Sequence, residues 1–229
     1  GFIPWDDDID VAVPRADYNR LCKLWQSVAA TEFILQDWHT ERNFPYYFTK
    51  IRRKHTRAEE LLLRKAEIEQ GVYIDIFPLD ICPDSPKIAT LFFQLVSLIN
   101  CGVLAQVSSE FVCGYQTAPV RLAWGILAHI PVRALFHLRE WVRVLFGAFA
   151  SGRRLCTVGG NHGYPRESYE RAWFETPARL WFEEKPRPCP GRWSELLSSM
   201  YGDYMKMPVE EEKNGHFLKV EIDREWREE

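Results

Sequence analysis

Three aspartates in the first ten residues alternate along a segment that has the composition of a short strand. The segment reads Gly1-Phe-Ile-Pro-Trp-Asp-Asp-Asp-Ile-Asp10 and continues into Val11-Ala-Val-Pro14. Side chains alternate between the two faces of a strand, so Asp6, Asp8 and Asp10 are predicted to share one face. Successive members of such a row lie about 6.5 Å apart, which suits a cation held between carboxylates better than direct contact. Carboxylate oxygens favour hard ions, so the segment predicts a Mg²⁺ or Mn²⁺ site.

The opposite face of this predicted strand is apolar. Ile9, Val11 and Val13 alternate with the aspartates, and we expect them to pack against the core. A solvated acidic loop is the plainer interpretation, but such loops do not usually continue into an alternating apolar strand. An EF-hand is excluded, because Val11 and Asp17 occupy its glycine and glutamate positions.

A second predicted strand carries one carboxylate among apolar residues. It reads Gly71-Val-Tyr-Ile-Asp-Ile-Phe-Pro-Leu-Asp80. Alternation puts Asp75 on the same face as Tyr73. A buried carboxylate is costly unless it is hydrogen-bonded or bound to an ion, so Asp75 is predicted to be the third metal ligand. Asp80, which follows Pro78, is interpreted as a turn or capping residue.

Basic residues cluster toward the end of another predicted strand, over residues 46–52. Lys50 and Arg52 share one face of it. A solvated basic surface is the plainer interpretation. Beside an acidic metal site, however, cations are what phosphate recognition requires, and we expect these two side chains to bind phosphate.

The elements that must position these side chains follow from periodicity. Apolar residues at helical spacing predict an amphipathic helix over residues 15–30, directly behind the acidic strand. Aromatic and β-branched residues predict a strand over 32–37 in addition to 46–52. Helices are further predicted over residues 118–150, with a break at Pro131, and over 193–204, whereas 182–192 is predicted to be an exposed turn and the tail from residue 210 to fray.

Two of the helical segments bear on membrane contact. Residues 88–109 carry no charge, but polar residues interrupt them, so a buried or membrane-facing helix is favoured over a membrane span. The second half of residues 118–150 sets leucine and phenylalanine against Arg133, His137, Arg139 and Arg143. This pattern fits a helix on an anionic membrane and, equally, a core helix with a solvated cationic face.

Composition restricts the class of protein. A chain of 229 residues with 46% hydrophobic residues can form one large domain or two small ones with a sizeable core. A net charge of -3 gives no general case for nucleic-acid binding. The six cysteines contain no Cys-x-x-Cys pair, which is typical of reduced thiols.

Three motifs together resemble the LicD family of phosphotransferases, relatives of fukutin and fukutin-related protein. They occur in the family's order and span nearly the whole chain. The motifs are Gly1 to Asp10 with Pro14-Arg-Ala-Asp-Tyr18, Tyr73-Ile-Asp-Ile-Phe-Pro-Leu-Asp80, and Leu196 to Pro208 with Tyr201-Gly-Asp-Tyr-Met205.

The resemblance implies an α+β fold of the nucleotidyltransferase type, similar to DNA polymerase β, in which a small mixed sheet is flanked by helices and joined by an additional helical region. On this basis we expect a catalytic core in residues 1–84, a helical and partly basic amphipathic region in 85–150, and a loop-rich C-terminal part of the same domain in 151–229. Family members have a Gly-Thr-Leu-Leu-Gly-like turn shortly before the acidic strand. This chain begins after it, so we expect the core to be truncated at its N-terminus.

The resemblance also implies a reaction. It is the Mg²⁺-dependent transfer of a substituted phosphate, such as phosphocholine, from a CDP-activated donor to a hydroxyl of a cell-surface glycan of the teichoic acid or lipopolysaccharide type. The paired acids of the family map onto Asp8 and Asp10 and the third acid onto Asp75, which are expected to bind the metal and act in catalysis.

The remaining site residues are expected to act on the substrate or around it. Lys50 and Arg52 would steady the phosphates, and Asp6 would support the ligands. Trp5 and Tyr73 would stack on the base or contain a choline head by cation–π contact.

The expected partners are a CDP-linked donor and a glycan or glycolipid acceptor, with peripheral membrane contact through the Arg-rich helices and no nucleic acid. The expected location is the cytoplasm at the inner face of the membrane, or the Golgi lumen in a eukaryote. Two alternatives stay open: a nucleotide-sugar glycosyltransferase, which also uses an Asp-x-Asp metal site, and a non-catalytic relative that binds glycolipid or membrane.

Overall fold

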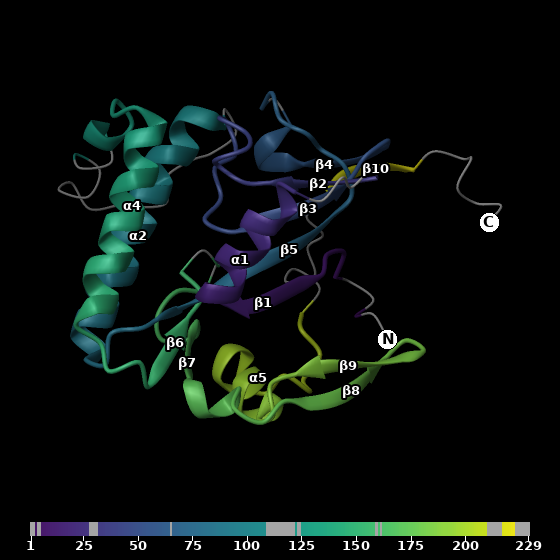
Figure 1. Ribbon diagram of the computed structural model, residues 1–229, viewed down its shortest axis with the longest axis vertical. Helices are drawn as coiled ribbons and strands as arrows, with labels where there is room; N and C mark the ends of the chain where they lie inside the picture. The colour runs from purple at the N-terminus through teal and green to yellow at the C-terminus, as the bar shows by residue number, and fades with distance from the viewer. Residues whose placement is uncertain are drawn as a thin grey trace.

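The computed structural model describes residues 3, 6–27, 32–64, 66–108, 122, 125–158, 160, 162–209 and 217–222 (Figure 1). The helices are α1 (Arg15–Trp25), α2 (Pro86–Val107), α4 (Val132–Ala148) and α5 (Trp193–Tyr201). The strands are β1 (Asp10–Pro14), β2 (Phe33–Gln36), β3 (Thr49–Arg53), β4 (Thr56–Glu60), β5 (Tyr73–Ile81), β6 (Arg154–Cys156), β7 (Ser168–Glu170), β8 (Ala178–Phe182), β9 (Lys185–Cys189) and β10 (Phe217–Ile222). This mixture of helices with parallel and antiparallel strands confirms the α+β class.

Strand β5 is the centre of the main sheet. The strand order is β2-β3-β5-β6-β7, and β1 pairs with β5 outside this path. The pairing of β1 with β5 is parallel, whereas β3 runs antiparallel to β5. Asp75 of β5 is therefore opposite Asp10 in β1 and opposite Lys50 in β3.

The sequence explains how β5 begins so close to β3. A Cβ atom on Gly71 would lie 2.2 Å from the carbonyl oxygen of Arg53, so only glycine allows this approach. The residues that follow Gly71 are β-branched and aromatic, as a buried strand requires.

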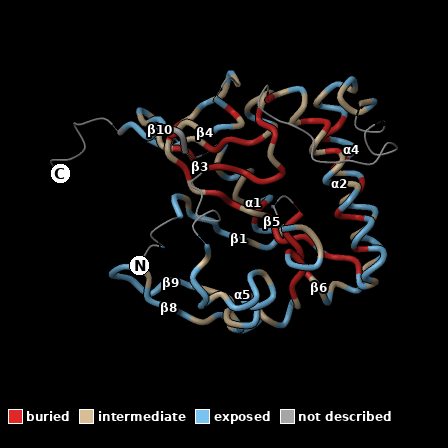
Figure 2. The backbone as a smooth tube through the Cα atoms, turned by 180° about the vertical axis from the view of Figure 1, so that it is seen from behind, coloured by how far each residue is buried: buried red, intermediate tan, exposed pale blue. Residues whose placement is uncertain are grey.

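Helices α2 and α4 form an antiparallel pair that stands at one edge of the molecule, opposite the β8–β9 hairpin (Figure 1). Gln106, in the last turn of α2, donates a hydrogen bond of 2.8 Å to the carbonyl of Ile130, just before α4. Phe92 and Val96 of α2 pack with Leu135 of α4 in the main core, and the inner sides of both helices are buried (Figure 2). The other helix near the sheet, α1, begins directly after β1 and contacts β5.

Three expectations about the elements are wrong. Ile9 and Val11 do not pack but lie more than a third exposed, and only Val13 of the three apolar residues is half-buried. Residues 217–222 do not fray but pair antiparallel with β4. Much of the predicted exposed turn belongs to the β8–β9 hairpin, whose two-stranded sheet tolerates proline because both strands are edges.

Other expectations are confirmed. The helix from Arg15, the two strands before residue 54, the helix break at Pro131 and the helix that begins at Trp193 all occur in the structure, although this last helix ends at Tyr201. The division into 1–84, 85–150 and 151–229 stays a prediction.

Candidate metal centre

Two neighbouring strands bring three of the predicted ligands together. Asp10 and Asp75 are partners in the parallel pairing of β1 with β5, and the amide of Asp75 donates to the carbonyl of Ile9 over 2.9 Å. Asp8 lies two residues before the start of β1. One carboxylate oxygen from each of Asp8, Asp10 and Asp75 lies within 4.8 Å of the other two. A single strand pairing thus brings together Asp10 and Asp75, which are 65 positions apart in the sequence.

These residues fit a divalent cation. Two oxygens on opposite sides of a Mg²⁺ ion lie about 4.2 Å apart, since each Mg–O bond is about 2.1 Å, and the cluster is close to that spacing. Asp75 Oδ1 is buried and accepts no hydrogen bond from the described residues. Lys50 Nζ is 3.0 Å away, but this is an ion-pair contact without hydrogen-bond geometry. A buried oxygen in this state gains most from a metal ligand bond.

The electrostatics of Asp75 also favour a bound cation. Burial raises the pKa of this carboxyl from its ordinary value of 3.8 to about 7, and the charges of Asp10 and Glu60 add to the effect. Lys50 opposes it. A divalent ion placed between the three acids would remove the repulsion between Asp10 and Asp75.

Asp6 lies outside this three-ligand cluster. It is exposed and groups instead with Asp7 and Asp8, one carboxylate oxygen of each lying within 4.8 Å of the others. It is near enough to support Asp8, and its role stays a prediction.

Lys50 is brought to the acids, but its surroundings are different from those of a solvated phosphate ligand. Its side chain is buried, and Nζ lies 3.0 Å from Asp75 Oδ1 and 3.4 Å from Glu60 Oε2. Burial lowers the pKa of the ammonium group, while Glu60 and Asp75 act in the opposite direction. Lys50 therefore balances the charge behind Asp75.

Arg52 does not reach the acid cluster, and the expectation that it binds phosphate has no support from its position. Its side chain is fully buried, donating to Glu60 Oε1 over 2.6 Å and to the carbonyl of Gly71 over 2.8 Å. It also donates to the side chain of Gln36. Strand β4, which the sequence did not predict, supplies Glu60 and so holds Arg52 inside the sheet.

Of the two aromatic residues expected to contact the base or head group, the structure describes only Tyr73. Tyr73 is buried, and Lys50 Nζ lies 3.3 Å from the centre of its ring, with the Arg52 guanidinium at 4.7 Å. The ring therefore makes its cation–π contacts with the protein's own side chains. Trp5 lies outside the described residues.

Asp80 is a structural anchor and not merely a turn or capping residue. Arg15 binds it through two hydrogen bonds of 2.7 and 2.6 Å, and Tyr47 donates a third of 3.0 Å. Arg143 of α4 approaches to 3.4 Å. Asp80 thus ties α1 and α4 to the central strand, which explains why Arg15 and Asp80 both lie within the family-like motifs.

The third motif faces the acids from another part of the chain. Tyr201, at the end of α5, is about half exposed; partial desolvation raises the pKa of its hydroxyl, and the charges of Asp10, Asp6 and Asp8 raise it further. Its ring meets that of His162 edge-on, with centroids 5.5 Å apart. In Figures 1 and 2, α5 lies beside β1. This motif is recognisable in the sequence only by its resemblance to the family, which assigns no role to Tyr201.

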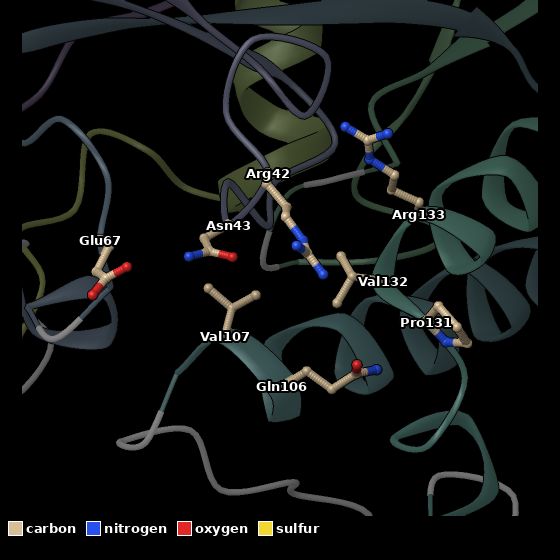
Figure 3. A pocket seen from close by; sticks show the side chains of 8 residues that line it. All are labelled: Arg42, Asn43, Glu67, Gln106, Val107, Pro131, Val132 and Arg133. Atoms are coloured by element: carbon tan, nitrogen blue, oxygen red, sulfur yellow. The ribbon is translucent and has the colours of Figure 1, made fainter.

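A cavity among the described residues lies away from the acids. It has a volume of about 760 Å³ and lies where the end of α2 meets the start of α4 (Figure 3). Arg42, Glu67, Gln106 and Arg133 are among the side chains that line it. It shares no residue with the cluster of Asp8, Asp10 and Asp75.

Comparison with known proteins agrees with the motifs. Residues 1–83 match the family model described as LicD/FKTN/FKRP, nucleotidyltransferase domain. The chain is also 25% identical, over 229 residues, to the lipopolysaccharide cholinephosphotransferase LicD of Haemophilus influenzae (strain ATCC 51907 / DSM 11121 / KW20 / Rd), covering 95% of this chain and 81% of the relative. No solved structure matches significantly. All three predicted acids lie within the matched segment, so the resemblance to the LicD family includes the acid cluster.

Proposed function

We propose that this protein is a metal-dependent phosphotransferase that moves a phosphocholine-type group from a CDP-linked donor to a hydroxyl of a lipopolysaccharide-type glycan. The observation that carries the proposal is the convergence of Asp8, Asp10 and Asp75 from two neighbouring strands, with oxygens within 4.8 Å of one another. The relative named as a lipopolysaccharide cholinephosphotransferase supports the transferred group and the acceptor. A nucleotidyltransferase-like arrangement of the sheet and a CDP donor belong to the same proposal.

Asp8, Asp10 and Asp75 would hold Mg²⁺ or Mn²⁺. When bound, the ion neutralises charge on the donor's pyrophosphate and on the phosphoryl group in transfer. The open position of Asp10 on the outer strand leaves that side of the cluster accessible to a donor, whereas Asp75 is buried on the inner side. The two strands thus define an inner, protein side and an outer, substrate side of the site.

The transfer exchanges one phosphorus–oxygen bond for another. The acceptor hydroxyl oxygen attacks the phosphorus of the transferred group, and the bond from this phosphorus to the CMP oxygen breaks. The hydroxyl proton must leave the acceptor, and a carboxylate of the cluster accepts it. CMP and a phosphodiester are the products, so atoms and charge balance without a further reactant.

Lys50 and Tyr73 would act from behind the cluster. Lys50 holds Asp75 in place through its ion pair, and Glu60 fixes Lys50 in turn over 3.4 Å. Tyr73 supports Lys50 through its ring. In this proposal Lys50 positions a ligand and does not contact the donor phosphates itself.

The experiment is Mg²⁺-dependent release of CMP from CDP-choline, with a lipopolysaccharide acceptor, by this chain. Wild type is expected to turn over and the Asp10→Asn variant to be inactive, while Asp17→Asn, an exposed aspartate of α1, serves as the matched control. Mass analysis of the glycan distinguishes the reaction class. A phosphodiester-linked substituent supports the proposal, whereas a plain glycosidic bond formed from a nucleotide sugar would show a glycosyltransferase instead.

A further inference from the structure

The outward face of the α2–α4 pair is apolar. On α4, Leu138, Trp141 and Leu145 recur at helical spacing on the exposed side, and Phe149 follows at its end. Trp141 is 61% exposed and Phe149 83% exposed. Ile88 of α2 lines a hollow of about 440 Å³ together with Leu145 and Phe149, so the two helices share one surface. We call this surface the outer face; its exposed apolar residues are Ile88, Leu91, Leu138, Trp141, Val144, Leu145 and Phe149.

Helix α4 differs from an ordinary surface helix because it buries a charged side chain and exposes apolar ones. Arg139, which the sequence placed on a cationic outer face, is fully buried. It donates to Asn100 Oδ1 over 2.8 Å and to the carbonyl of Tyr46 over 3.2 Å, and its guanidinium lies 4.7 Å from the centre of the Tyr47 ring. Burial lowers the pKa of Arg139 to about 10. These contacts fix the rotation of α4 and thereby hold Trp141 and Phe149 outward.

Cations flank the outer face. Lys87 and Arg133 are exposed in the first turns of α2 and α4, and these turns lie at opposite ends of the pair because the helices are antiparallel. Among the described residues of this region, Arg139 is buried and Arg143 is paired with Glu140 over 2.9 Å, so the exposed cations are Lys87, Arg133 and Arg153. Asp84, an exposed acid that lines the same hollow, is bound by Ser151 through hydrogen bonds of 2.7 and 2.6 Å. An apolar surface between cations is complementary to an anionic lipid surface.

The burial of one side of α2 favours contact along a bilayer surface over crossing the bilayer. Among the described residues, α2 is the one helix long and apolar enough to span a membrane. However, Phe92, Val96 and Val103 on its inner side are fully buried in the main core. Insertion of α2 across a bilayer would remove these side chains from the core, whereas contact through the outer face leaves them in place.

We infer that the outer face docks on an anionic phospholipid surface, with α2 and α4 lying in the interfacial plane and Trp141 and Phe149 entering the acyl region. Aromatic side chains are favoured at this depth, and the flanking Lys87 and Arg133 meet the headgroups. The inference rests on the helices and not on the acid cluster, so it holds whether or not the proposed reaction is correct.

Vesicle flotation of the full chain tests the inference. Vesicles of phosphatidylcholine with about one third phosphatidylglycerol are expected to bind the wild type, and vesicles of pure phosphatidylcholine to bind it at least about tenfold more weakly. The double variant Trp141→Gln, Phe149→Ser is expected to lose at least about tenfold in partitioning to the mixed vesicles. Trp181→Gln, which changes an exposed tryptophan on β8, is the matched control and should bind like the wild type.

A second measurement locates the contact. Lipids brominated in the acyl chain quench tryptophan that enters the bilayer, so quenching is expected for the wild type and much less for Trp141→Phe, which keeps an apolar side chain and still binds. Absence of binding to mixed vesicles, or equal binding by the double variant, would overturn the inference. Concentration-dependent dimerisation without vesicle binding, abolished in the double variant, would instead assign the outer face to a second copy of the chain.

Discussion

Two aspartates of the same strand, five positions apart, have opposite environments. Asp75 and Asp80 are both buried, with 4% and 2% of their surfaces exposed. Asp80 accepts hydrogen bonds from Arg15 and Tyr47 and has Arg143 at 3.4 Å. Asp75 faces Asp10 and keeps one oxygen without a hydrogen bond from the described residues.

This difference distinguishes a structural residue, Asp80, from a candidate ligand-binding residue, Asp75. A carboxylate whose hydrogen bonds are satisfied by its own chain holds elements together, and it has nothing left to offer a ligand. Asp75 lies beside another acid, and although Lys50 pairs with it, its Oδ1 accepts no hydrogen bond from the described residues and can still bind a metal ion. Burial alone does not distinguish the two residues, but their partners do.

The largest expected effect is on catalysis. Asp10→Asn is expected to lower the rate of CMP release at least about 10³-fold, since it removes one metal ligand and the transferred phosphoryl group loses charge stabilisation. Asp10 is exposed, so the variant should fold, which circular dichroism checks. A rate within tenfold of the wild type would be inconsistent with a catalytic role.

The next effect is on stability and concerns the anchor. Asp80→Ala is expected to lower the free energy of unfolding by about 3 kcal/mol, because Arg15 and Arg143 lose their buried carboxylate. Urea denaturation measures it, with Asp17→Ala as the control that should change stability by less than about 0.5 kcal/mol. If Asp80→Ala unfolds like this control, Asp80 is not an anchor.

A smaller effect concerns the pH dependence of stability without metal. The pKa of Asp75 is raised by burial from 3.8 to about 7, with Asp10 and Glu60 adding to the rise and Lys50 opposing it. The folded state therefore binds this proton more tightly than the unfolded state, and stability falls as the pH rises from about 4 through 7.

Asp75→Asn cannot ionise and should escape this loss. The pKa rise, which already includes the opposing effect of Lys50, corresponds to about 4 kcal/mol over the whole titration. The stability advantage of the variant over wild type is therefore expected to grow by about 2–3 kcal/mol from pH 5 to pH 8, measured by urea denaturation in a chelator. A constant difference across this range would show that Asp75 does not titrate as described.

The smallest effect is expected at Tyr201. Its hydroxyl stays protonated and can donate to an anionic substrate at the acid cluster, so Tyr201→Phe is expected to lower kcat/KM about three- to tenfold. Tyr204→Phe, which loses a 3.0 Å hydrogen bond with Ser194 in the same motif, is the control and should retain activity. Equal losses in both variants would point to a structural role for the motif.

The sequence predicts those features of the site that depend on local rules, such as alternation along a strand. Alternation along a strand put Asp8 with Asp10, and the cost of burying Asp75 among apolar neighbours marked it as a ligand. The structure adds the parallel register that makes Asp10 and Asp75 neighbours. Nothing in the local pattern specifies register between strands so far apart, although the family resemblance implied that these acids act together.

The sequence misled where a distant partner decided the outcome. Arg52 has the local pattern of a phosphate ligand, and only Glu60 on β4 and the carbonyl of Gly71 make it a buried structural residue. Arg139 has the pattern of a solvated cation, and Asn100 on α2 turns it inward. The sequence shows the spacing of charged side chains on a strand or helix, but only the tertiary structure shows which groups they pair with.

Binding of Mn²⁺ to the wild type and to variants, measured by titration calorimetry, tests the central claim most directly. We predict a saturable site in the wild type and in Asp17→Asn, with at least about tenfold weaker affinity in Asp8→Asn and in Asp10→Asn. Equal affinity in all four proteins, or no saturable binding in the wild type, would contradict the claim that Asp8, Asp10 and Asp75 form a metal centre.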